Sequence, residues 1–357
     1  MHQAFRVVLR IAFALMVSGA ASTISAADGQ PDRYPWDRRP FFCQLQKNAK
    51  APLCMTSDWP TYEITVDRLR ELLWSGRFAL LERALTELNA SGQVDPGGLS
   101  HADAVQKTLG DLLRHQAQAR TLGADLFELW RQAYPESHFL KLASVMRHYR
   151  SARTGTDRRT PEQLPEAYEL REQHLRAAEQ LLLDFPAHVK DGPLWHLLRL
   201  ELASEQDNPT PKPGVLFAEA TKKWPRDLSF YGVVLQELLP KSGGSWTVVE
   251  SFIDQSSRQV QATEGQSFYA RLYHQIGYEV VQKKTNVDWG RLMQGFEDWI
   301  SQRMDFRIKN LYASYACASR DKSAFAKAMG HLGKDQLSPS DWLDGHSYEA
   351  CTRWAGI

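Results

Sequence analysis

The chain has 357 residues, with 43 Lys and Arg against 42 Asp and Glu, and a formal net charge of +1. A nucleic-acid-binding domain usually carries a clustered basic excess, and this composition shows none, so we expect no nucleic-acid partner. The length suffices for one large domain or a repeat array. No apolar run approaches the ~20 residues that a membrane-spanning helix needs, so we expect no span once the amino-terminal segment is removed.

The first residues are typical of a secretory signal peptide. Arg6 and Arg10 precede a short apolar run from Ile11 to Val17, and small residues follow. This order of charged, apolar and small residues predicts a signal peptide over 1–26, cleaved after Ala26 or one residue later. An amino-terminal membrane anchor is the alternative. The mature protein is therefore expected to be periplasmic or secreted.

The cysteines Cys43, Cys54, Cys317 and Cys351 are even in number. In an exported protein this number suggests disulfides. The sequence permits three pairings, and proximity favours Cys43–Cys54 and Cys317–Cys351. A structural zinc site usually contains closely spaced cysteine pairs. None is present, so we expect neither a metal nor a cofactor.

The segment 27–64 is rich in Pro, Arg and aromatic residues and shows no helical period. We interpret it as an irregular arm, pinned by a Cys43–Cys54 bridge.

From Thr65 onward the apolar residues recur at helical spacing. Two successive stripes flank Gly76, and their members are Val66, Leu69, Leu72, Leu73, then Phe78, Leu81, Leu85 and Leu88. Two apolar-faced helices that meet at a glycine predict an antiparallel hairpin. The hairpin reads like a tetratricopeptide-type helix pair.

Similar stripes continue to the end of the chain, and Ser100 is a candidate helix cap. An aromatic residue followed by Pro closes three of the predicted helices, at Tyr134, Phe185 and Trp224. Polar or Pro-rich stretches near 154–160 and 206–214 are predicted exposed loops and candidate sub-boundaries. Ser338-Pro339 is expected to start a last helix. We predict an all-α fold in which tandem helix hairpins over 65–357 form an α-solenoid like that of tetratricopeptide proteins.

The eleven Trp of the chain are more than ordinary usage. They could fill the core between stacked helices or line a concave binding face.

The most distinctive segment is a glycine-rich stretch made of Lys241, Gly243, Gly244, Ser245 and Trp246. It has two readings. One is a tight helix–helix turn in which Ser245 caps the next helix. The other is a binding turn for an anion, with Lys241 and backbone N–H groups at a helix amino terminus.

With these features the chain resembles a bacterial family, the domain of unknown function 4034. The resemblance rests on the hairpin from Leu72 to Leu85, on Tyr134 to His138, on Pro240 to Ser245 and on Asn310 to Cys317 with Asp321-Lys322. It covers roughly Val66 to Trp342. The resemblance implies a helical, tetratricopeptide-like fold and no assigned activity.

No stretch of the sequence forms a recognised catalytic motif, and we assign no catalytic residue. Glu136-Ser137-His138-Phe139 matches a motif of peptidoglycan-cleaving transglycosylases, but Pro135 would break the helix that carries the acid. We expect an exported non-catalytic interaction or scaffold protein whose partner is another protein or peptide. The alternatives are an envelope enzyme with an unrecognised site, near Lys241 to Trp246 and Tyr273-His274, or an immunity or inhibitor protein for a secreted toxin.

Overall fold

The computed structural model describes residues 62–94, 100–122, 125–154, 164–277, 284–303, 306–333, 336–338, 341–343 and 345–357. The predicted signal peptide, nearly all of the predicted arm and the predicted Cys43–Cys54 bridge lie outside these residues. The described part is helical and contains no strand, only an isolated bridge between Val94 and Ser100. This confirms the predicted all-α fold class.

The helices of the described residues run from Tyr62 to Ala355. In chain order they are α3 (Tyr62–Trp74), α4 (Phe78–Ser91), α5 (His101–Leu122), α6 (Leu126–Ala133), α7 (His138–Arg153), α8 (Pro165–Leu183), α9 (Ala187–Lys190), α10 (Pro193–Glu205), α11 (Pro213–Lys223), α12 (Leu228–Leu238), η3 (Pro240–Ser242), α13 (Trp246–Glu264), α14 (Ser267–Ile276), α16 (Trp289–Gln302), α17 (Phe306–Ala318), α18 (Lys322–His331) and α19 (Tyr348–Ala355).

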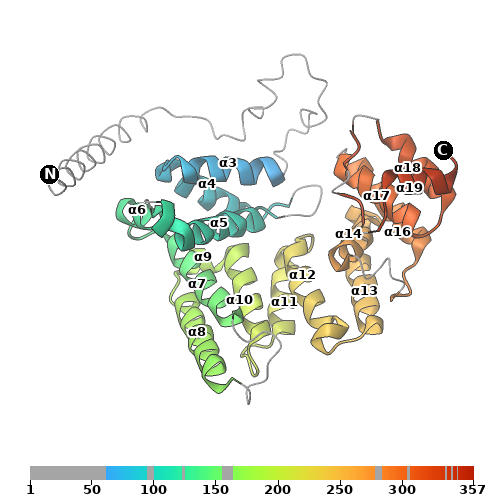
Figure 1. Ribbon diagram of the computed structural model, residues 1–357. Helices are drawn as coiled ribbons and strands as arrows, with labels where there is room; N and C mark the ends of the chain where they lie inside the picture. Colours follow the sequence, from blue (N-terminus) through green and yellow to red (C-terminus); the bar gives the residue numbers. More distant parts are fainter. Residues whose placement is uncertain are drawn as a thin grey trace.

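The chain follows an arc (Figure 1). It descends from α3 through α7 and α8, crosses through α10 to α12, and rises through α13 and α14 to α16–α19. Most helix contacts join neighbours in the chain, as between α7 and α8 or α17 and α18. Helix α10 is an exception, because it also contacts α4, α5 and α7. It therefore ties the first helices to the middle of the arc.

The opening hairpin has the structure that its apolar stripes predict. Leu69 and Leu73 on α3 and Leu81 and Leu85 on α4 are 0% exposed. The connection turns at Gly76, whose φ is +68°. Glycine adopts this left-handed conformation without steric cost, so the two apolar faces meet across a tight turn.

Within the part of the chain that the structure describes, two large hydrophobic clusters and one small one make the core. The first joins α3 to α10 and the second joins α12 to α19. The small cluster lies between them and contains Leu197 and Leu200 of α10, Leu216 of α11 and Phe230 of α12. Of the nine Trp in the described residues, Trp130, Trp195, Trp299 and Trp342 are buried and four more are half-buried against the core clusters, whereas Trp74 is 47% exposed.

Several predicted helix ends are confirmed. The hydroxyl of Ser100 accepts the N–H of Asp103 at 3.0 Å, as an N-cap does. Helices α6 and α11 end one residue before Tyr134 and Trp224, and α8 ends two residues before Phe185. The predicted start of the last helix is wrong.

That last helix, α19, begins at Tyr348 rather than at Ser338-Pro339. Its cap is Ser347, whose hydroxyl accepts the N–H of Ala350 at 3.2 Å. The N–H of Ser338 instead donates to the side chain of Asn310 at 3.1 Å. Ser338 therefore anchors a connecting segment to α17.

A disulfide joins Cys317 of α17 to Cys351 of α19, with 5.8 Å between the Cα atoms. This pairing confirms the Cys317–Cys351 bridge that proximity in the sequence favours. Both cysteines are buried, so the bridge fixes the last helix onto the carboxy-terminal core.

Candidate binding site

The glycine-rich stretch connects α12 to α13 through the short helix η3. The N–H of Ser242 donates to the carbonyl of Leu239 at 2.9 Å, and the N–H of Gly243 donates to that of Pro240 at 3.1 Å. The N–H of Gly244 also donates to Leu239, at 3.1 Å. These backbone groups are therefore committed to the turn itself.

The side chains of the stretch face solvent. Lys241, Gly243, Gly244 and Ser245 are exposed, and Trp246 is half-buried against the carboxy-terminal core. Ser245 caps α13 as predicted, with its hydroxyl accepting a backbone N–H at 3.3 Å. This geometry is that of a helix–helix connection, and anion binding by the turn stays a prediction.

Tyr273 and His274, the other predicted candidates, lie in the carboxy-terminal core. Tyr273 is 2% exposed. The His274 ring lies between Trp299 and Tyr315, with both ring centroids 6.2 Å away. Burial lowers the pKa of His274, which favours the neutral imidazole. These contacts are those of a core histidine.

Glu136, the acid of the transglycosylase-like stretch, lies at the surface. Its side chain is 90% exposed and pairs with Lys141 at 3.2 Å. The catalytic acid of a glycosidase works in a partly buried, apolar surrounding, which this exposed carboxylate does not have.

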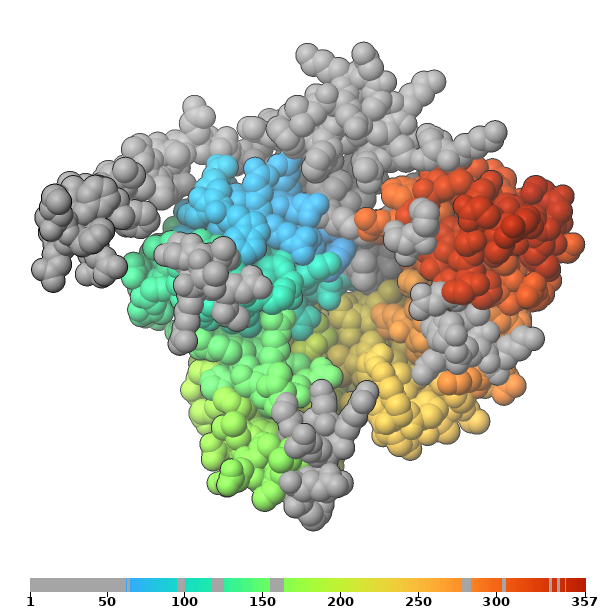
Figure 2. Space-filling model, in the orientation of Figure 1, coloured from blue at the N-terminus to red at the C-terminus, as the bar shows by residue number. Residues whose placement is uncertain are grey.

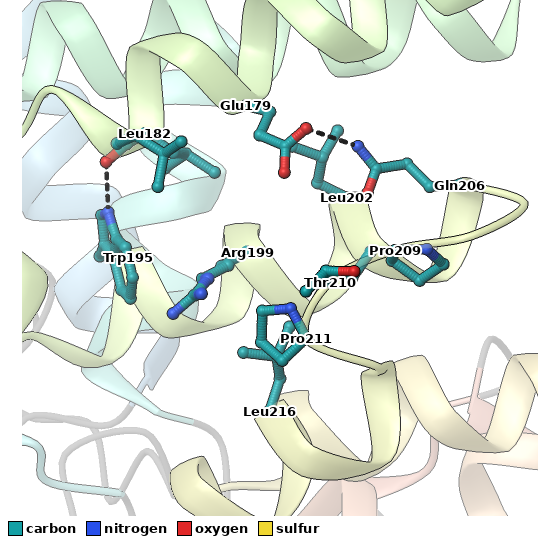
Figure 3. A pocket seen from close by; sticks show the side chains of 12 residues that line it. Glu179, Leu182, Trp195, Arg199, Leu202, Gln206, Pro209, Thr210, Pro211 and Leu216 are labelled. Carbon is teal, nitrogen blue, oxygen red and sulfur yellow. Dashed lines mark hydrogen bonds between the residues drawn. The ribbon is translucent and has the colours of Figure 1, made fainter.

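The structure instead shows a pocket between α8, α10 and α11 (Figure 3). It holds about 440 Å³ including the part open to solvent. Its lining comes from three helices and the connection before α11, and consists of Glu179, Leu182, Leu183, Trp195, Arg199, Leu202, Ala203, Gln206, Pro209, Thr210, Pro211 and Leu216.

Helical spacing places these side chains on facing surfaces. Glu179 and Leu182 are one turn apart on α8, and Trp195, Arg199 and Leu202 follow one another at i, i+4 and i+7 on α10. Each helix thus presents one face to the pocket. The connection 206–211 closes the third side.

Two hydrogen bonds hold the walls together (Figure 3). The indole Nε1 of Trp195 donates to the carbonyl of Leu182 at 2.9 Å. The amide of Gln206 donates to the carboxylate of Glu179 at 3.1 Å. The first bond joins α8 to the first turn of α10, and the second joins α8 to Gln206, directly after α10, so the two walls are linked at both ends of α10.

Arg199 brings a positive charge to a pocket whose lining is mostly apolar but also contains Glu179, Gln206 and Thr210. Its guanidinium carbon lies 5.0 Å from the ring centroid of Trp195, a cation–π distance. In the described part of the chain, Arg199 has no hydrogen bond and no ion pair with a carboxylate. Among the described residues, no ion pair neutralises its charge.

Sequence reasoning missed this pocket. The stretch 206–214 is predicted as an exposed loop, yet Pro209 is buried and Pro211 is half-buried. Both prolines line the pocket. The signal that could have found it is the i, i+4, i+7 row of Trp195, Arg199 and Leu202, which sets a charged residue among apolar ones.

Within the described residues, no group of three or more His, Cys, Asp or Glu is placed to hold a metal ion. No helix among them combines the length and the apolar character needed to cross a membrane.

We found no match to this chain among family models, curated proteins or solved structures. The resemblance to the domain of unknown function 4034 family therefore stays a prediction.

Proposed function

We propose that this chain is an exported, non-catalytic interaction protein that binds another protein or a peptide. The observation that carries the proposal is the pocket between α8, α10 and α11. It offers apolar walls, one guanidinium and one carboxylate, which are groups that recognise a ligand. Helical arrays commonly use their curved surfaces for binding partners, and we propose a tetratricopeptide-like solenoid here.

The pocket rim supports this role. Leu183 lines the pocket and is 50% exposed. Burial of its remaining apolar surface by a partner would stabilise a complex, because apolar area removed from water contributes about 25 cal/mol per Å². Val215, also 50% exposed, lies outside the lining and offers a matched control.

We place the protein in the periplasm or outside the cell. The Cys317–Cys351 disulfide is compatible with an oxidising compartment. The predicted signal peptide over 1–26 supports the same location.

Peptide display against the purified mature protein tests the proposal. We expect saturable enrichment of peptides, with binding weakened at least about fivefold by Leu183→Gln. Val215→Gln should bind as the wild type does. Circular dichroism checks that both variants keep the helical fold. Equal recovery of peptides by the wild type and Leu183→Gln would overturn the proposal.

A further inference from the structure

The pocket places a guanidinium directly beside apolar walls. Arg199 and Leu202 lie on the same face of α10, and Leu182 and Leu216 come from the two helices next to it (Figure 3). A ligand that satisfies both features must carry a negative charge within a few bonds of an apolar group.

We propose that the pocket binds the carboxyl-terminal residue of a peptide whose last side chain is apolar, with Arg199 holding the terminal carboxylate. This inference rests on the proposed function and names the chemistry of its ligand.

The state of Arg199 supports a carboxylate partner. A guanidinium presents five N–H donors in one plane. The guanidinium of Arg199 packs against the indole ring of Trp195, and no described residue accepts a hydrogen bond from its N–H groups. A carboxylate matches this fork with two parallel hydrogen bonds.

The position of the apolar walls points to a chain end. In a carboxyl-terminal residue the carboxylate and the side chain leave the same carbon atom. The carboxylate of Arg199's partner would then sit next to a side chain packed among Leu182, Leu202 and Leu216. An internal Asp or Glu has its carboxylate at the tip of the side chain and brings no apolar group with it.

Glu179 favours a peptide over a fatty acid. Its carboxylate has about four acceptor positions, and Gln206 donates to one of its oxygens. The remaining capacity suits a peptide N–H, which a fatty acid lacks.

The test uses the full mature protein and the N-acetylated pentapeptide Ala-Ala-Ala-Ala-Leu, made as the free acid and as the amide. Binding is measured by isothermal titration or by competition with a labelled copy of the acid. We expect the acid to bind at least tenfold more tightly than the amide, because a hydrogen bond to a charged group is worth about 1.5–3 kcal/mol.

Arg199→Gln should remove this preference by weakening the acid to the level of the amide. Lys212→Gln is the matched control, because Lys212 is exposed in the adjoining connection and does not line the pocket. It should leave the preference unchanged. An amidated peptide with an internal Asp should bind no better than the leucine amide.

Two results separate the inference from the proposed function. If acid and amide bind equally and Leu183→Gln weakens both, the carboxylate assignment is wrong and the pocket is still an interaction site. If neither peptide binds and display yields no peptide sensitive to Leu183→Gln, the assignment and the proposed function are both overturned.

Discussion

The carboxylate of Glu264 and the guanidinium of Arg271 form an ion pair inside the α13–α14 hairpin, where the two side chains are 2% and 1% exposed. Arg226 pairs with the other oxygen of Glu264. The side-chain amide of Gln302, on α16, donates to the backbone carbonyl of Glu264 at 3.1 Å. One buried carboxylate residue thus links α13, α14 and α16.

Removal of the carboxylate should strongly destabilise the protein. Glu264→Gln leaves the buried charge of Arg271 without its counter-ion, and breaking such a pair costs about 3–5 kcal/mol. The loss is measured from the shift in the urea midpoint of unfolding, provided that the slope of the unfolding free energy against urea concentration is unchanged. The control is Arg258→Gln, which breaks a surface pair with Asp254 whose arginine side chain is 71% exposed. That variant should lose less than about 1 kcal/mol. Equal losses in the two variants would contradict the buried-pair argument.

The Cys317–Cys351 disulfide should contribute about 4 kcal/mol, because it closes a loop of 34 residues in the unfolded chain. Cys351→Ser, compared with the oxidised wild type in chemical denaturation, gives this difference. The wild type with added reductant should unfold like the variant. Thiol labelling of the oxidised native protein should modify neither Cys317 nor Cys351, and rapid labelling of either would show that the bridge is not formed.

The helices could be predicted from the sequence because their information is local. The stripe of Leu69, Leu72 and Leu73 needs only a 3.6-residue period to be recognised, and all three side chains are at most 3% exposed. Serine caps such as Ser245 are read within four residues. The start of the last helix was predicted wrongly because the backbone N–H of Ser338 donates a hydrogen bond to the side chain of Asn310. Asn310 is distant in the sequence, so no local pattern reveals this contact.

The pocket could not be predicted, since it depends on three segments that meet only in the folded chain. Glu179 and Gln206 are 27 residues apart, yet one hydrogen bond joins them. A Pro-rich connection looks exposed in sequence terms. The burial of Pro209 depends instead on how α10 and α11 pack.

The two glycines of the α12–α13 connection should differ in their tolerance of a side chain. A Cβ at Gly244 would lie 2.0 Å from the backbone carbonyl oxygen of Leu238, whereas at Gly243 it would meet no atom within 4 Å. Gly243 has a φ of +92°, so Gly243→Ala should cost about 1 kcal/mol. Gly244→Ala should cost more, about 3 kcal/mol, because backbone must move.

Thermal unfolding of both variants, with and without phosphate, separates the two readings of the connection. A structural turn predicts that phosphate leaves the melting temperature unchanged and that Lys241→Ala behaves as the wild type. A phosphate-dependent rise in melting temperature that Lys241→Ala abolishes would instead establish anion binding.

His196 should make the protein less stable in acid. Its ring lies between Trp195 and Trp224, with both ring centroids 5.2 Å away. Burial, with a smaller contribution from Lys223 and Arg199, lowers the pKa of His196 to about 4. In the unfolded chain the pKa is about 6.5, so between these values the unfolded state binds the additional proton. Stability must therefore fall as the pH falls from about 6.5 to about 4.

The difference between the wild type and His196→Gln isolates this effect. Burial raises the pKa of Glu201 to about 7 and that of Asp227 to about 6, which gives the opposite slope over part of the same range. Those two contributions are common to both proteins and cancel in the difference. We expect the wild type to lose about 3 kcal/mol relative to His196→Gln between pH 7 and pH 4. Urea unfolding across this range measures the difference, and the exposed substitution Lys222→Gln should track the wild type at every pH. Parallel profiles for the wild type and His196→Gln would show that His196 takes up its proton equally well in the folded chain.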